Sequence, residues 1–170
     1  MLRINRLRVE INTAKGVYGI DESFKAGLNF IASLENTCGK SSILAAIYYC
    51  LGFEQILGGA GGIGSKVLTS AFKTAIEDKV ESLMVTESGA YLEISNGNET
   101  RTIYRNIKSE SKDNHLVTVY FGDFASISNP KTLSEDYYVN IQNSATSEKG
   151  FHTFLEEFLH YVKAEKHKEH

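Results

Sequence analysis

The tetrapeptide Gly39-Lys40-Ser41-Ser42 stands between two apolar segments, and this arrangement restricts the fold more than any other feature of the chain. The run 28–32 before it is short and largely apolar, as expected for a β-strand. The segment 39–57 contains no proline, and its apolar residues recur at near-helical spacing. Alanines and tyrosines fill its other faces, so the predicted helix is apolar on most sides and is expected to be buried.

The composition fits one globular domain. The chain has 170 residues, of which 42% are hydrophobic and 23% charged, enough to bury a core. Its net charge of −3 lacks the basic excess of most nucleic-acid-binding proteins. Cys38 and Cys50 have neither the spacing of a zinc site nor that of a disulfide framework. The longest nearly uncharged run, 41–53, is too short to cross a membrane, so we expect a cytoplasmic protein without a membrane partner.

Several segments have the alternating pattern of β-strands. Before residue 33 we expect three of them, over 2–11, 18–24 and 28–32. Further along the chain, strands are predicted over 82–86, 90–95, 99–107 and 115–124. Asn96-Gly97 joins two of these segments and is a strong hairpin signal, which predicts an antiparallel meander.

The remaining segments differ in character. Five glycines within 58–64 predict a flexible loop, because glycine loses much backbone entropy in regular structure. The segment 66–79 is a weaker helical candidate, and the polar stretch 126–150 is a candidate functional loop. A clean apolar stripe predicts a helix from Phe151 to Val162, followed by a solvated tail.

The segment 34–42 has the layout of a phosphate-binding P-loop, because a strand enters it and a helix leaves it. Backbone N–H groups of such a loop surround an anion, and the helix N-terminus adds a favourable dipole. Lys40 is expected to reach the β- and γ-phosphates, and the Ser41 hydroxyl to bind Mg²⁺. The sequence departs from the pattern at Leu34, where the motif has glycine.

The run from Phe24 to Ile31, the sequence ENTCGKSS and the aliphatic helix after it together resemble the N-terminus of SMC, RecN and SbcC-type ATPases. This resemblance implies an α/β P-loop NTPase fold. More specifically, it implies an ABC-ATPase head lobe with a central mixed sheet, an antiparallel β-lobe and a C-terminal helix. Residues 1–150 would form the N-terminal lobe of the nucleotide-binding domain, and 151–170 a helix leading toward a coiled coil.

The resemblance also implies a ligand set, ATP and Mg²⁺, with no other metal. Ser42 would lie near the α-phosphate, beside the roles already given to Lys40 and Ser41. The residues expected to wrap the phosphates are Asn36, Thr37, Cys38, Gly39, Lys40, Ser41 and Ser42. Arg6 and Lys15 lie where basic residues of the family can touch phosphate, but ordinary surface charge explains them as well.

Other parts of the family's catalytic machinery have no clear counterpart. Phe121 stands where the family has the Q-loop glutamine; Gln142 and Asp123 are weak substitutes. The run 116–123 is a poor match to a Walker B strand, because Gly122 interrupts it before the acidic residue. No LSGG-like signature occurs, so no catalytic residue is assigned.

Hydrolysis would therefore require a C-terminal half, from the same protein or a partner chain, and a head-to-head dimer. The family acts in DNA double-strand-break repair, chromosome maintenance or phage defence, so DNA is a possible partner of the full assembly. Two alternatives stay open at this point. One is a non-enzymatic remnant or interaction module with a degenerate P-loop; the other is a stand-alone small P-loop kinase or GTPase, although no NKxD motif occurs.

Overall fold

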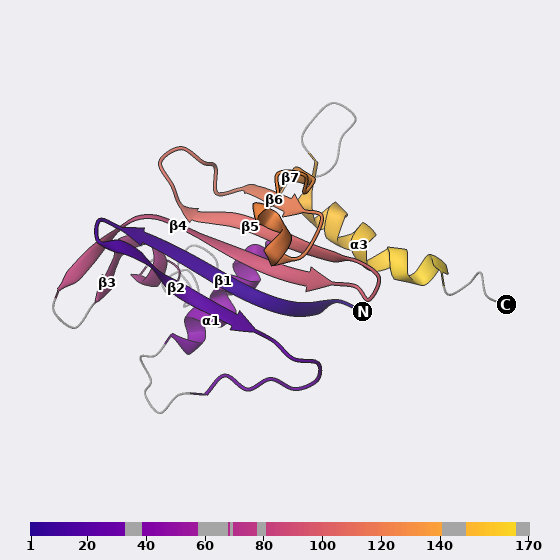
Figure 1. Ribbon diagram of the computed structural model, residues 1–170, viewed down its shortest axis with the longest axis horizontal. Coiled ribbons are helices and arrows are strands. Elements are labelled where there is room, and N and C mark those ends of the chain that lie inside the picture. Colours follow the sequence, from indigo (N-terminus) through magenta and orange to yellow (C-terminus); the bar gives the residue numbers. More distant parts are fainter. Residues whose placement is uncertain (33–38, 58–67, 69, 78–80, 141–148, 166–170) are drawn as a thin grey trace.

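The computed structural model describes residues 1–32, 39–57, 68, 70–77, 81–140 and 149–165. It is an α/β fold in which helices pack on a seven-stranded sheet (Figure 1). The elements are β1 (Arg3–Thr13), β2 (Gly16–Ser23), α1 (Lys40–Cys50), η1 (Glu54–Leu57), η3 (Ser70–Thr74), β3 (Ala75–Glu77), β4 (Ser82–Ser95), β5 (Thr100–Lys108), β6 (Leu116–Tyr120), η4 (Phe124–Ser128), β7 (Ser134–Tyr138) and α3 (Phe151–Glu165).

The strand order is β2-β1-β4-β5-β6-β7, and β3 pairs with the first residues of β4. All these strand pairs are antiparallel, whereas the resemblance implied a central mixed sheet. The hairpin predicted at Asn96-Gly97 is confirmed, since β4 pairs with β5 and Gly97 has a φ of 100° in the turn. The meander predicted within 82–107 contains two strands, β4 and β5, and β6 adds the third antiparallel strand. The segments 82–86 and 90–95, predicted as two strands, form the single long strand β4, which pairs with β1 along most of its length.

The strand predicted over 28–32 is absent: the segment has no regular structure, and none of the described strands pairs with its backbone. Its side chains point into solvent, with Leu28 80% and Phe30 84% exposed. The strand prediction over 115–124 was too long, because β6 ends at Tyr120. The polar stretch 126–150 is not a continuous loop, since it contains β7.

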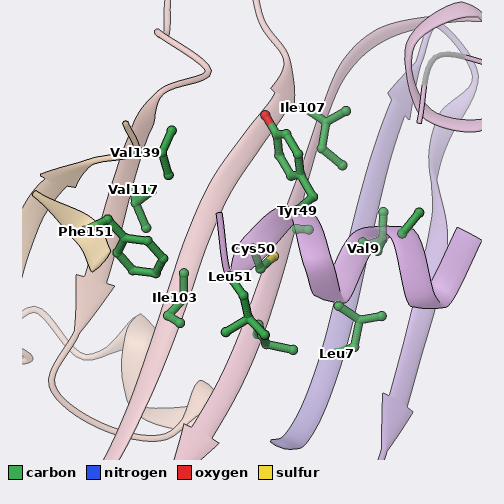
Figure 2. Close-up of a cluster of buried hydrophobic side chains, with 14 of the residues drawn as sticks. Leu7, Val9, Tyr49, Cys50, Leu51, Ile103, Ile107, Val117, Val139 and Phe151 are labelled. Carbon is green, nitrogen blue, oxygen red and sulfur yellow. The ribbon is translucent and has the colours of Figure 1, made fainter. Parts of the chain in front are cut away.

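One face of the sheet carries the core. Leu7 and Val9 of β1 point to this face and are almost fully buried, while Arg6 and Arg8, the residues on either side of Leu7, point to the other face. Figure 2 shows α1 crossing this face, with Leu51 near its end. The side chains of Ile103, Val117, Val139 and Phe151 fill the space beyond the end of α1, so α3 starts in the same core.

The opposite face carries η4. Phe124 lies under the guanidinium groups of Arg6 and Arg8, at 4.6 and 5.3 Å from its ring centre. Its ring also meets Tyr91 of β4 edge-on, with centroids 5.4 Å apart. The sheet therefore separates α1 from η4.

Helix α1 is shorter than predicted. The spacing of apolar residues predicted a helix over 39–57, but α1 ends at Cys50 and a 3₁₀ turn, η1, follows. The helix predicted over 66–79 is found only in part: among its described residues Leu68 is helical, Ser70–Thr74 form the π-helical turn η3, and Ala75–Glu77 form strand β3. The C-terminal helix is confirmed as α3. None of the described helices is long and apolar enough to cross a membrane.

Candidate functional site

The site predicted from the sequence centres on the N-terminus of α1. Gly39 is the N-cap residue and has a φ of 72°, in the left-handed region that glycine adopts without steric cost. Its carbonyl accepts hydrogen bonds from the backbone N–H groups of Ser42 and Ile43 at 3.0 and 3.1 Å, which closes the first helical turn. Asn36, Thr37 and Cys38, together with Leu34, lie outside the described residues.

The helix N-terminus has the polarity that an anion requires. The first N–H groups of an α-helix have no acceptor within the helix, and they carry a partial positive charge. The N-cap residue Gly39 has no side chain that could cap this end of α1, and the first turn of the helix has no acidic residue. Lys40 is half-buried there, Ser41 is exposed and Ser42 is buried. The structure thus brings together the four predicted residues it describes, Gly39 to Ser42.

The loop before this site is organised by Asn29. The Asn29 side-chain amide donates to the carbonyls of Lys25 and Gly27 at 2.9 and 3.2 Å, and its oxygen accepts from the Lys25 N–H at 2.9 Å. Gly27 has a φ of 90°, which favours glycine at this turn. The spacing Phe24-x-x-Gly27-x-Asn29 therefore has a physical basis that the sequence motif did not reveal.

Apolar surface adjoins the site. A cavity of about 670 Å³ is lined by the start of β1, the segment 24–29, Ile47 of α1 and the β4–β5 turn. A smaller cavity of about 270 Å³ lies between the end of β2, the segment 29–32 and Ile43. On α1 itself, Leu44 is 50% exposed. The face of α1 turned away from the sheet is therefore only partly covered by the described residues.

The other candidate residues are engaged elsewhere. Asp123 caps η4 by accepting the Ser126 N–H at 2.9 Å, on the face of the sheet opposite α1. The Arg101 guanidinium lies 4.6 Å from the ring centre of Phe121. The structure therefore does not bring either residue to the N-terminus of α1. Gln142 lies outside the described residues.

Arg6 and Lys15, the two basic residues considered as possible phosphate contacts, both have acidic partners. Arg6 makes a bidentate ion pair with Asp21, both contacts at 2.7 Å, and this contact lowers the pKa of the Asp21 carboxyl below its usual value. The Lys15 ammonium pairs with Glu81. Neither residue is needed to explain the site at α1.

One signal for the arrangement at the far end of α1 is present in the sequence: alternation along the strand 99–107 places Arg105 on the same face as Ile103 and Ile107. Arg105 of β5 is buried there, at 2% exposure of its side chain, and pairs with Glu54 of η1. A buried arginine is rare unless it is paired, and the sequence does not show the pair. The packing of α1 and η1 against β5 supplies the partners of Arg105, the Tyr49 carbonyl and the Glu54 carboxylate.

Comparisons with protein-family models, with curated proteins and with solved structures found no match to this chain. We therefore infer the function of the chain from the geometry of the site at α1 and from the motif that forms it.

Proposed function

We propose that this chain is the Mg-ATP-binding N-terminal half of an SMC/RecN/SbcC-like ABC-type ATPase. The observation that carries the proposal is the N-terminus of α1, which Gly39 opens in a left-handed conformation immediately before Lys40 and Ser41. In a P-loop, a helix N-terminus of this kind presents backbone N–H groups, an ammonium and a hydroxyl to a nucleotide and its Mg²⁺. Residues 28–32 do not form the strand that normally leads into such a loop, so the proposal rests on the helix end and on the motif.

In this proposal, Lys40 contacts the β- and γ-phosphates, Ser41 binds Mg²⁺ and Ser42 lies near the α-phosphate. Asn36, Thr37 and Cys38 complete the loop around the phosphates. Mg²⁺ would neutralise part of the charge on the ATP phosphates. The role of this chain would then be to bind the nucleotide and to orient its phosphates.

The partner in this proposal is a C-terminal half, from the same protein or another chain. The exposed apolar side chains of Leu28 and Phe30 and the half-exposed Leu44 support it, because a partner would bury apolar surface that is now in contact with water. The C-terminal half would supply the Walker B carboxylates and the signature segment, and two heads would then close over ATP. Repair of DNA breaks, chromosome maintenance and phage defence are the processes in which such an assembly would act.

The test is calorimetric titration of Mg-ATP into the purified chain and into Lys40→Ala, with released phosphate assayed in the same samples. Loss of the ammonium should weaken binding about 10- to 100-fold, as for a hydrogen bond to a charged group. Lys131→Ala is the matched control, since it removes one exposed lysine from the loop after η4. Ser41→Ala should weaken the dependence of binding on Mg²⁺.

Binding that depends on Lys40, with little turnover, is the expected result for a lobe that lacks its second half. Robust turnover by this chain alone would contradict the proposal and favour a stand-alone P-loop enzyme. Absence of binding in the unaltered chain would also contradict it, and would leave an interaction module with a degenerate P-loop.

A further inference from the structure

An ion pair between the buried Arg105 and the partly buried Glu54, whose side chain is 29% exposed, holds the end of α1 that lies farthest from the candidate phosphate site. The Arg105 guanidinium donates to both carboxylate oxygens of Glu54, at 2.7 and 3.0 Å. The same group donates to the Tyr49 carbonyl at 2.7 Å and to the Asn114 carbonyl at 2.8 Å. One side chain of β5 thus ties together the last turn of α1, the turn η1 and the segment before β6.

The contact with Tyr49 is doubly specific. The guanidinium carbon lies 3.9 Å from the centre of the Tyr49 ring, close enough for a cation–π interaction. The Tyr49 hydroxyl donates to the Asn106 carbonyl at 2.6 Å. A cation at the C-terminus of a helix also interacts favourably with the helix dipole. The rotation of the last turn of α1 is therefore fixed by directional contacts from two consecutive residues of β5.

An ion pair of this kind adds little to the free energy of unfolding compared with apolar side chains. Burial works to raise the pKa of Glu54, and the hydrogen bonds and charge of Arg105 outweigh it, so the carboxyl stays ionised with a pKa below its usual value. Because both ions lose hydration, replacing a buried pair by apolar side chains of similar volume is often neutral or stabilising. Directional contacts can instead select one arrangement among several similar ones.

Helix α1 needs a directional contact of this kind. Its sheet-facing side chains include the small residues Ala45 and Ala46, and apolar packing has no directional preference of its own. Its opposite face is also apolar, so the sequence pattern of the helix specifies its rotation weakly. A shift or rotation at Tyr49 would carry Gly39 and Lys40 with it, because a helix is stiff over this length.

We propose that Arg105 and Glu54 are positioning residues, which set the axial position and rotation of α1 and so place its N-terminal turn for phosphate binding. The part of this inference that concerns phosphate binding rests on the proposed function. The part that concerns the position of α1 does not depend on the proposed function. The pair acts through the helix and does not touch the nucleotide.

The test replaces the pair in the full chain by apolar side chains, as Arg105→Met/Glu54→Leu. We expect an unchanged or higher urea midpoint, since the pair adds little net stability. Hydrogen exchange at the amides of α1 should become about tenfold faster, while exchange in β4 and β5 stays as it was. The dissociation constant for Mg-ATP should rise about tenfold.

The matched control is Lys149→Met/Glu135→Leu, which removes an exposed ion pair between β7 and the residue two before α3. It should leave both α1 exchange and nucleotide affinity unchanged. Arg105→Lys is a second variant in case the double substitution does not fold. A lysine keeps the charge but lacks the planar fork that reaches three partners, so α1 exchange should rise by about threefold.

Measuring both α1 exchange and Mg-ATP affinity tests the positioning role separately from the proposed function. Unchanged α1 exchange and unchanged affinity in Arg105→Met/Glu54→Leu would overturn the positioning role. A uniform rise of exchange through the whole sheet, with a lower urea midpoint, would overturn it in favour of a purely structural pair. Faster exchange confined to α1 in a chain that binds no ATP would support positioning while the proposed function fails.

Discussion

At the scale of single residues, Gly52 decides where α1 ends. Its φ of 71° places it in the left-handed region, directly after the C-cap residue Leu51. The Phe53 N–H donates to the Tyr48 carbonyl at 2.8 Å, and the Gly52 N–H to the Tyr49 carbonyl at 3.0 Å. These two bonds form a Schellman motif, which ends a helix and satisfies its last carbonyls. The apolar period continued past this point, so periodicity alone predicted too long a helix.

Gly52→Ala should be costly for two separate reasons. A Cβ atom at Gly52 would lie 2.8 Å from His152 Nε2 and 3.0 Å from Val139 Cγ1, and the left-handed conformation is itself strained for alanine. We expect a loss of about 2 to 3 kcal/mol in the free energy of unfolding, measured by urea denaturation. Gly97→Ala is the control, since it has a φ of 100° but open space around its Cβ, and strain alone should cost about 1 kcal/mol. Equal losses at the two sites would show that the contact with α3 does not matter.

At the scale of elements, α3 is held by a row of aromatic rings. The centroids of Phe151 and Phe154 are 5.9 Å apart, and those of Phe154 and Phe158 are 5.8 Å apart. Tyr137 of β7 packs against Phe154, with centroids 4.9 Å apart. The Asn96 side chain, at the β4–β5 turn, donates to the Phe158 carbonyl at 2.9 Å. The stripe predicted from the sequence is thus the docking face of α3.

Phe154→Ala should therefore destabilise the chain by about 3 to 5 kcal/mol, as for other buried aromatic residues, because it leaves a cavity against Tyr137. Leu159→Ala on the exposed side of the same helix should change stability by less than about 0.5 kcal/mol. Thermal unfolding followed by circular dichroism measures both. A small effect of Phe154→Ala would mean that α3 contributes little to the cooperative unit.

At the scale of the whole molecule, the described chain has one sheet with a well-packed face, and apolar side chains remain exposed beside α1. Leu28 and Phe30 are the most exposed of these, apart from the first residue. They belong to a segment that pairs with none of the described strands. Large exposed apolar surface favours association, either with a partner or between copies.

Leu28→Ser/Phe30→Ser should leave the free energy of unfolding within about 0.5 kcal/mol, because both side chains are already exposed. The variant should stay monomeric at concentrations where the unaltered chain associates, as measured by sedimentation velocity over a concentration series. Val17→Ser is the control, since Val17 is an exposed apolar residue on the edge strand β2. If the double variant associates as strongly as the unaltered chain, this apolar segment is not the contact surface.

Much of the fold could be predicted because local patterns determine it. Alternation placed β1, and Asn96-Gly97 located the hairpin between β4 and β5. The aromatic stripe located α3. The strand predicted over 28–32 failed because a strand needs a neighbour to pair with, and residue pattern alone does not show whether one is present.

The candidate site divides in the same way. The start of α1 at Lys40 could be predicted, because the motif is local, and the phosphate role of Gly39, Lys40 and Ser41 stays a prediction. Arg105 and Glu54 could not, since they lie far apart in the sequence and neither belongs to a motif. Asp123 was a candidate by sequence position only; the sheet places it on the face away from α1.

The sequence by itself determined the order and kind of most elements, since backbone preference, side-chain period and turn chemistry act over a few residues. Only the tertiary structure decided which face of the sheet each segment covers, where α1 stops and which buried charge finds a partner. Those outcomes depend on contacts between residues distant in the chain, such as Arg105 with Glu54 and Phe53 with His152. Close packing and the cost of an unpaired buried charge select among arrangements that the local pattern allows equally.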